Sequence, residues 1–334
     1  MTEADVVVAV PQPRARKDSR PPRVRVQRRA LHGVLLLDKP LGLSSNDALQ
    51  KAKWLLRAEK AGHTGTLDPL ATGLLPLCFG AATKFSQASL DADKRYLATL
   101  ALGIRTTTGD AEGEVLERLD AAHITPEQIA AACAAFTGEI DQTPPMYSAL
   151  KHEGKALYEY ARAGIEIERK SRRVTIHAID IVAVQAGTVT LDVRCTKGTY
   201  IRTLAEDIGT RLGCGASLAA LRRTGSGSLT LDGSITLAEL EALPEEQRAA
   251  LLTSPDRLLA DAPELRLPAE EAARFLSGLR RRVTAPDAER VRVYGPESRA
   301  FLGSAHITSG ELIADRLLTP PEVQALLQEA TASA

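Results

Sequence analysis

A glycine-rich segment at residues 62–73 holds the side chains best suited to chemistry. It reads GHTGTLDPLATG, with Asp68 in its middle and His63 near its start. Its glycines, proline and hydroxylated residues predict a tightly turned loop, and loops on a rigid scaffold commonly carry functional groups. A carboxylate in such a loop can act as a nucleophile. Taken alone, an aspartate before a proline is more often a turn-former or a cap, and a lone histidine is more often a hydrogen-bonded loop residue.

A second segment, residues 197–203, reads KGTYIRT and joins a predicted strand to a predicted helix. Its order K-G-T differs from the G-K-[ST] of a phosphate-binding loop and the upstream glycine is missing, which argues against a Walker site. Tyr200 and Arg202 flank Ile201, which belongs to the apolar stripe of the helix, so their side chains leave the helix start on either side of that stripe. Arg202 can therefore pair with a carboxylate across a cleft, or be an ordinary surface charge.

The elements that must position these segments mix strands and helices without regular alternation. Apolar runs or alternation predict strands at residues 33–37, 96–102 and 189–195. Helical spacing of apolar residues predicts a helix at residues 200–212. Two further helices are predicted to begin at capping boxes, one formed by Ser44 with Asp47 and one by Thr125 with Gln128. This mixture predicts an α+β fold.

Length and composition bound the class of protein. The chain has 334 residues, which predicts two folded domains, and its 44% hydrophobic and 25% charged residues are typical of soluble globular proteins. No apolar run is long enough to span a bilayer, and Glu3 and Asp5 stand where a signal peptide needs positive charge. We therefore expect a cytoplasmic protein with no membrane segment. The four cysteines lack C-x-x-C spacing, so neither a zinc site nor a disulfide framework is predicted.

Charge and proline patterns divide the chain into four parts. Residues 13–29 hold eight Lys or Arg against the single acid Asp18, which predicts a disordered basic arm at residues 1–30 that contacts phosphates or serves as a solubilising tail. A catalytic domain is predicted at 31–258, a small β-rich domain at 259–319 and a tail at 320–334. The arginine run at 280–282 can likewise bind phosphates or be a solvated charge run.

Four blocks of this sequence resemble the TruB family of tRNA pseudouridine synthases. They read GHTGTLDPLATGLLPLCFGAATKF, DKRY, KGTYIRTLAEDIG and LRR, and their order and spacing agree with the family from about residue 31 to 318. The resemblance implies a pseudouridine synthase fold with a mixed, mainly antiparallel central sheet flanked by helices, followed by a PUA-like domain. It also implies a monomer that binds the T arm of tRNA and isomerises uridine 55 by base flipping, with an aspartate nucleophile and no metal or cofactor.

The same resemblance implies residue roles. Asp68 matches the catalytic aspartate, Tyr96 the tyrosine that stacks on the target base, and Arg202 the arginine paired with the aspartate. Four more match residues that bind or support the flipped nucleotide: His63, Tyr200, Leu221 and Lys39. One departure is Thr107, which stands where many relatives have an acid.

The chemistry fits these roles but leaves alternatives open. Arg202 beside Asp68 is expected to keep the carboxyl ionised in a pocket where burial alone would raise its pKa. Asp68 could attack C6 of the base or C1′ of the ribose, or the route could pass through proton loss at C2′. A rival from another class is a non-catalytic tRNA-binding or tRNA-folding chaperone that uses the same cleft. An aspartyl phosphotransferase is disfavoured, because the loop lacks a second acid.

Overall fold

The computed structural model describes residues 27–297 and 300–332. Most of the predicted basic arm therefore lies outside the described residues, as does the end of the predicted tail. The described part of the arm joins the fold, because the backbone N–H of Arg29 donates to Arg57 at 2.7 Å and its carbonyl accepts from Glu59 at 3.0 Å.

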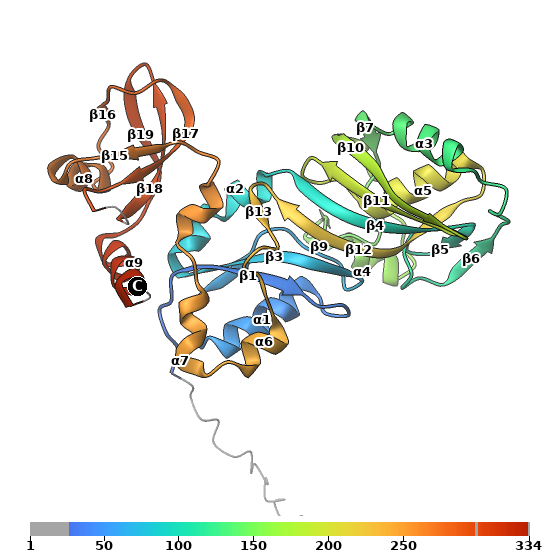
Figure 1. The fold of residues 1–334 in the computed structure, drawn as a ribbon, viewed down its shortest axis with the longest axis horizontal. Helices are drawn as coiled ribbons and strands as arrows, with labels where there is room; N and C mark the ends of the chain where they lie inside the picture. The colour runs from blue at the N-terminus through green and yellow to red at the C-terminus, as the bar shows by residue number, and fades with distance from the viewer. Residues whose placement is uncertain (1–26, 298–299, 333–334) are drawn as a thin grey trace, which may run out of the picture.

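A ten-stranded sheet runs through the larger part of the molecule (Figure 1). Eight strands follow one another across it in the order β14-β1-β3-β12-β4-β11-β10-β7, and β13 and β2 pair with β12 and β3. All pairs are antiparallel except β1 with β14 and β3 with β12. The strands are β1 (Gly33–Lys39), β2 (Ala61–His63), β3 (Ala71–Phe79), β4 (Lys94–Leu102), β7 (Gly138–Gln142), β10 (Arg172–Gln185), β11 (Thr188–Cys195), β12 (Ala216–Ser226), β13 (Leu229–Thr230) and β14 (Ile235–Thr236). The expected mixed, mainly antiparallel sheet is confirmed.

Helices flank this sheet near its two ends (Figure 1). One core contains residues from α1, α6, α3 and α5 together with the sheet. The helices of this domain are α1 (Ser45–Leu55), α2 (Ser86–Asp91), α3 (Pro126–Ala135), α4 (Leu157–Arg162), α5 (Ile201–Leu212), α6 (Leu237–Ala242) and α7 (Glu245–Arg248), with 3-10 turns η1 (Gly80–Phe85), η2 (Ala249–Leu251) and η3 (Pro255–Leu259). Two small hairpins complete it: β5 (Ile104–Thr106) with β6 (Val115–Arg118), and β8 (Lys151–His152) with β9 (Lys155–Ala156).

The local predictions that position the site are confirmed with one change. The Ser44 hydroxyl accepts from the backbone N–H of Asp47 at 3.1 Å and caps α1, and Thr125 forms a full capping box at α3. β11 alternates buried and half-buried residues as predicted. The almost continuous apolar run at residues 96–102 is typical of a well-buried strand, but only every second residue of β4 is buried.

A five-stranded sheet forms the C-terminal domain, which confirms the predicted β-rich unit. Its order is β15-β17-β18-β19-β16, and the tail predicted to follow it is mostly a helix. The elements are β15 (Glu264–Arg266), α8 (Ala269–Leu276), β16 (Arg281–Arg282), β17 (Ala288–Tyr294), β18 (Phe301–Thr308), β19 (Glu311–Leu317) and α9 (Pro320–Ala332).

The two domains share a second hydrophobic core. On β1, Leu35 and Leu37 belong to the first core, whereas Val34 and Leu36 belong to the one shared with the C-terminal domain. Both faces of this strand are therefore covered, which explains its continuous apolar run. The ring centroids of Phe301 and of Phe85 in η1 lie 5.1 Å apart. Apolar packing therefore holds the C-terminal domain against the larger domain.

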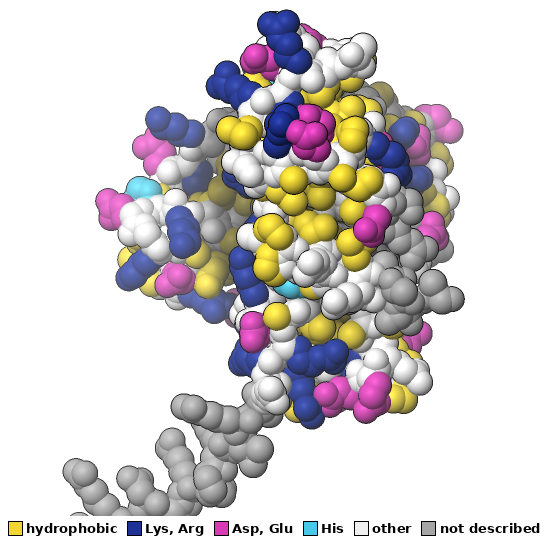
Figure 2. All heavy atoms as spheres, turned by 90° about the vertical axis from the view of Figure 1, so that its left-hand side faces the viewer, with side chains coloured by type: hydrophobic (Ala, Val, Ile, Leu, Met, Phe, Trp, Pro, Cys, Tyr) yellow, Lys and Arg dark blue, Asp and Glu magenta, His cyan; other side chains and the backbone are white. Residues whose placement is uncertain are grey.

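Charges of both signs are interspersed on the end of the molecule formed by the C-terminal domain (Figure 2). In the arginine run, Arg281 pairs with Glu271 and Arg280 lies 3.9 Å from Glu311. The four cysteines are buried free thiols. Among the described residues, no helix is long and apolar enough to cross a membrane, and no group of three His, Cys, Asp or Glu side chains could hold a metal ion.

Candidate active site

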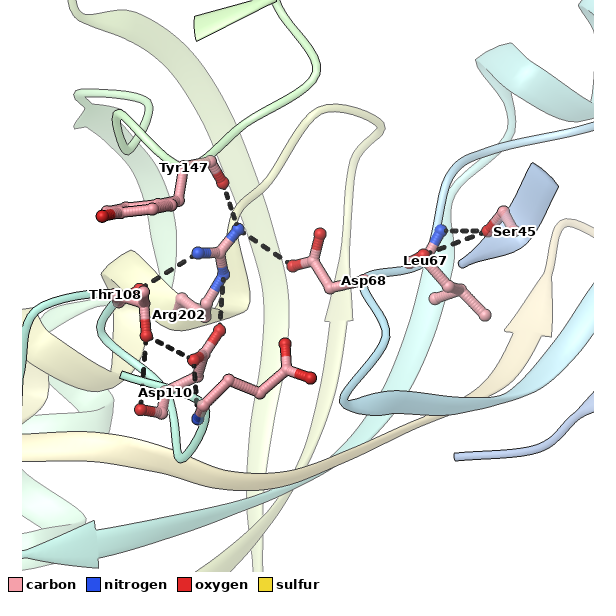
Figure 3. A network of polar contacts seen from close by, with 8 residues as sticks. Ser45, Leu67, Asp68, Thr108, Asp110, Tyr147 and Arg202 are labelled. Carbon is pink, nitrogen blue, oxygen red and sulfur yellow. Dashed lines mark hydrogen bonds and ion pairs between the residues drawn. The ribbon is translucent and has the colours of Figure 1, made fainter. Parts of the chain in front are cut away.

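The loop that carries Asp68 is anchored to the start of α1. Ser45 is 1% exposed, and its hydroxyl accepts from the backbone N–H of Leu67 at 2.7 Å and donates to the Leu67 carbonyl at 3.1 Å (Figure 3). Leu67 itself is buried in the core. The carbonyl of Pro69 accepts from the backbone N–H of Gly42 at 2.9 Å. The residues on both sides of Asp68 are therefore fixed, which holds its carboxyl in one place.

Arg202, in the first turn of α5, reaches Asp68 and three other partners with three different nitrogens (Figure 3). Its Nη2 lies 2.9 Å from Oδ2 of Asp68 and donates to the carbonyl of Tyr147 at 2.6 Å. Its Nη1 donates to the carbonyl of Thr108 at 3.0 Å, and its Nε lies 3.5 Å from Oδ2 of Asp110. The guanidinium thus joins four chain segments and has almost no freedom to rotate.

The pair is buried asymmetrically. The Arg202 side chain is 5% exposed, whereas that of Asp68 is 41% exposed. The guanidinium therefore lies behind the carboxylate, and the carboxylate faces open space. Such an arrangement leaves the acid free to meet a ligand while its counter-charge stays in place.

Asp110 is a site residue that sequence reasoning missed. Its side chain is 4% exposed and accepts from the Thr108 hydroxyl at 2.5 Å and from the backbone N–H of Glu112 at 3.1 Å. It contacts Nε of the Arg202 guanidinium, whereas Asp68 contacts Nη2 (Figure 3). The signal available was the segment TTTGD, in which an acid follows a hydroxyl-rich turn. In this segment, sequence reasoning considered only Thr107.

Burial and the neighbouring cation Arg202 act in opposite directions on the pKa of Asp68. The pKa of its carboxyl is raised from the ordinary value, because burial outweighs the attraction of Arg202 and the negative charge of Asp110 adds to the rise. Arg202 does lower this pKa as expected, but it does not cancel the burial. Lys39 is fully buried, its pKa is lowered to about 8 mainly by burial, and its Nζ donates to the Leu43 carbonyl at 2.6 Å.

Two cavities meet at Asp68. The first has a volume of about 660 Å³, and Asp68, Arg202 and three of the predicted residues are among its lining: Tyr96, Tyr200 and Leu221. The second has a volume of about 460 Å³ and is lined by Asp68, Arg202 and His63 among others. The structure thus brings six of the predicted residues to one place, although His63 faces the second cavity. Lys39 lines neither cavity. Its Nζ lies 3.5 Å from the Pro69 carbonyl, so it supports the loop that carries Asp68.

Tyr200 is held by two neighbours in the first cavity. It precedes the first residue of α5, and its backbone N–H donates to Oε1 of Gln142 at 2.7 Å while its carbonyl accepts from Nε2 at 3.0 Å. Gln142 is 1% exposed, so this double contact is protected from water. The guanidinium of Arg172 lies 4.9 Å from the centre of the Tyr200 ring and donates to the Gly198 carbonyl. Sequence reasoning also missed Gln142 and Arg172, since neither stands in one of the four family blocks.

Tyr96 lies on β4, directly opposite Arg223 of β12. Both side chains are buried, and the guanidinium donates a hydrogen bond to the Tyr96 hydroxyl. Burial raises the pKa of this hydroxyl, and the positive charge of Arg223 opposes the rise. On the other side of β12, Gly73 approaches so closely that a Cβ there would lie 2.3 Å from the Arg223 carbonyl, which requires glycine.

Comparison with known proteins gives the same family along the chain. Residues 53–201 match the N-terminal domain of the TruB family pseudouridylate synthases, residues 202–262 the tRNA pseudouridylate synthase B C-terminal domain, and residues 263–318 the C-terminal domain of pseudouridine synthase II TruB. The tRNA pseudouridine synthase B of Verminephrobacter eiseniae is 58% identical over 311 residues, covering 91% of this chain and 94% of that protein. That of Ralstonia nicotianae is 62% identical over 300 residues, covering 87% and 95%.

Solved structures share the fold at lower identity. A chain of a Cbf5-Nop10-Gar1 complex superposes with a TM-score of 0.68 at 25% identity, covering 88% of this chain and 87% of that chain. A chain of an H/ACA RNP bound to a substrate RNA containing 2'-deoxyuridine superposes with a TM-score of 0.65 at 23% identity, covering 87% and 86%. The second likeness is one of fold.

Proposed function

Because the chain belongs to the TruB family of pseudouridine synthases, we propose that it isomerises uridine 55 in the T loop of tRNA, with Asp68 as the catalytic carboxylate. The coarser activity follows from the family: it is a tRNA pseudouridine synthase, an isomerase. The finer proposal includes the position of the uridine, the T arm as the bound part of tRNA, a monomeric enzyme and a cytoplasmic location.

One observation carries the assignment of Asp68. Its half-exposed carboxylate lies where two cavities meet. It is 2.9 Å from the buried guanidinium of Arg202, which four contacts hold in place. Arg202 opposes the rise in the Asp68 pKa that burial causes, so more of the acid stays ionised than burial alone would allow. An ionised carboxylate can add to carbon or stabilise a cation at C1′.

The proposed course begins with extrusion of the uridine from its stack, since C1′ and C5 are shielded inside a folded RNA loop. Tyr96 stacks on the base in the first cavity, and Tyr200 and Leu221 form its walls. His63 contacts neighbouring flipped nucleotides from the second cavity. The N1–C1′ bond breaks, C5 joins C1′, and N1 gains a proton while C5 loses one. Electrons and atoms balance within the substrate, so the proposed reaction requires neither a metal nor a cofactor.

The test is a comparison of the wild-type protein with Asp68→Asn on unmodified tRNA. We expect the wild-type protein to form one pseudouridine at position 55 and the variant to form none while binding tRNA with similar affinity. Asp232→Asn, which changes an exposed acid in a turn, is the matched control and is expected to keep full activity. Undiminished turnover by Asp68→Asn would refute the catalytic assignment. Tight tRNA binding by a wild-type protein that forms no product would favour the chaperone instead.

A further inference from the structure

Arg223 is a buried cation without a carboxylate partner among the described residues. It is 1% exposed, and its Nε donates to the Leu74 carbonyl at 2.7 Å and its Nη2 to the Gly65 carbonyl at 3.1 Å. Its remaining partner is the neutral hydroxyl of Tyr96, and no acidic group in the described part of the chain contributes to its electrostatics. The next residue on the same strand, Arg222, shows the usual arrangement, with two nitrogens 3.0 and 2.6 Å from the carboxylate of Asp38.

A second buried cation lies close to the first. Lys94 is 7% exposed, and its Nζ donates to backbone carbonyls only, those of Ser89 at 3.0 Å, Leu90 at 3.4 Å and Ala92 at 2.5 Å. A Cβ placed on Gly65 would lie 3.2 Å from Nη1 of Arg223 and 3.8 Å from Cε of Lys94, so both cations lie just beneath the loop that carries Asp68. Burial, and less strongly the charge of Arg223, lower the pKa of this amine to about 8, and the negative charges of Asp93 and Asp91 oppose the change.

Burying such charges without a counter-charge is unfavourable, because the protein replaces little of the lost hydration. Both side chains line the first cavity together with Asp68 and Tyr96. The two acids that line this cavity, Asp68 and Asp91, are paired with other cations, Arg202 and Lys197. The positive charge at its floor is therefore available to an anion. In an enzyme, such an anion can be a species that forms during the reaction and is absent from the bound substrate.

We propose that Arg223, assisted by Lys94, stabilises the negative charge that the uracil ring carries during isomerisation. This inference rests on the proposed function and deepens it. The position follows from register: Arg223 stands opposite Tyr96 on the adjacent strand, and its guanidinium touches the hydroxyl of the ring on which the base is proposed to stack.

The charge arises by each of the three routes that stay open. If Asp68 attacks C1′, the N1–C1′ electron pair leaves with the base as a uracil anion. If a proton is first lost from C2′, the same electron pair departs with the base. If Asp68 adds to C6, the electrons of the C5–C6 double bond move onto C5 and O4 as an enolate. In each case the charge is removed when C5 has bonded to C1′, C5 has lost its proton and N1 has gained one. The Asp68 carboxylate is released from C1′ or C6 in the first and third routes, and C2′ regains its proton in the second.

A preformed cation acts selectively on this species. The uracil of the bound substrate is neutral and gains little from Arg223, whereas the anion gains much in a site sheltered from water. The chemical step should therefore depend on the charge of Arg223, and tRNA affinity should not. A role limited to holding Tyr96 by a hydrogen bond predicts a different order of variants, since glutamine can also donate that bond.

The experiment measures single-turnover pseudouridine formation, with enzyme in excess over unmodified tRNA, and the dissociation constant of the same complex. Arg223→Gln removes the charge and keeps a donor, whereas Arg223→Lys keeps the charge. We expect Arg223→Gln to slow the chemical step about 100-fold with an unchanged dissociation constant, and Arg223→Lys to be clearly faster than Arg223→Gln. The matched control is Arg222→Gln, whose guanidinium already has a carboxylate partner, and it should keep the wild-type rate.

Several outcomes would overturn the inference. They are a wild-type rate for Arg223→Gln, a loss that lies wholly in tRNA affinity, or a glutamine variant at least as fast as the lysine variant. Thermal unfolding shows whether the Arg223 variants fold. If they do not, Lys94→Gln is measured instead, and we expect it to slow the chemical step as well. A wild-type rate for Lys94→Gln would then overturn the inference. A wild-type protein without product would refute the proposed function itself, whereas product from wild type with an unaffected Arg223→Gln would refute only this inference.

Discussion

Replacing Arg202 by lysine separates the charge of this side chain from its shape. Lysine keeps the positive charge but offers one nitrogen where arginine offers three. In the structure, those three nitrogens reach Asp68, Asp110 and two backbone carbonyls from different directions. A single ammonium lacks the planar fork, so it cannot keep the contacts to both acids and both carbonyls at once.

The contacts that are lost set the magnitude. A hydrogen bond or ion pair to a charged group contributes roughly 1.5–3 kcal/mol, and lysine loses at least two of the four, so the free energy of unfolding should fall by about 3 kcal/mol or more. Leaving one acid of a buried pair without its partner costs about 3–5 kcal/mol, and Asp110 is 4% exposed. A cation displaced by about 1 Å from Asp68 should also slow the chemical step about 100-fold.

Urea unfolding and single-turnover kinetics on unmodified tRNA measure the two effects. Arg95→Lys is the matched control, because Arg95 makes a bidentate pair with Asp192 at the surface. That pair should contribute less than about 1 kcal/mol and leave the rate unchanged. If Arg202→Lys kept wild-type stability and rate, the reasoning from the shape of the guanidinium would be wrong and only its charge would matter.

Three further predictions follow from the same contacts. Asp110→Asn removes a negative charge that raises the Asp68 pKa, so this pKa should fall and activity should persist to lower pH; an unmoved acid limb of the pH–rate profile would contradict the coupling. Gln142→Leu leaves the backbone N–H and carbonyl of Tyr200 without their side-chain partner, so urea unfolding should report a loss of about 1–3 kcal/mol, and tRNA affinity should weaken. Phe301→Ala empties the shared core of the two domains and should cost about 3–5 kcal/mol in calorimetry, whereas two separate transitions in wild type would argue against a shared core.

Sequence patterns predicted the parts of this fold that depend on neighbours along the chain. The cap at Ser44 involves residues three positions apart, and the alternation of β11 reflects a strand whose two faces differ in burial. The gathering of Asp68, Tyr96 and Arg202 at one cavity could be expected only from family blocks, because these residues come from different elements. The raised pKa of Asp68 could not be read from the sequence, because it depends on how much water the fold removes.

Several contacts missed by sequence analysis are made across long separations. Gln142 meets Tyr200 from 58 residues away, and Arg202 meets the carbonyl of Thr108 from 94 residues away. Gln142 has no distinctive sequence context, since a glutamine at the end of a short strand is usually exposed. The burial of Arg223 is equally invisible, because LRR reads as a surface charge run until β12 is placed between β3 and β4.

The distribution of charge gives the two proposals a common physical basis. Arg202 contacts two carboxylates, and of these Asp68 presents its negative charge to the cavity. Among the described residues, neither Arg223 nor Lys94 forms an ion pair with an acid, and only the weaker influence of Asp93 and Asp91 reaches Lys94, so the floor beneath Tyr96 carries positive charge. A nucleotide stacked on Tyr96 with its ribose toward Asp68 would have its glycosidic bond between these regions. Their field would stabilise positive charge at C1′ and negative charge on the base, which is the direction in which electrons move when that bond breaks. Neutralising either region should therefore slow the same step.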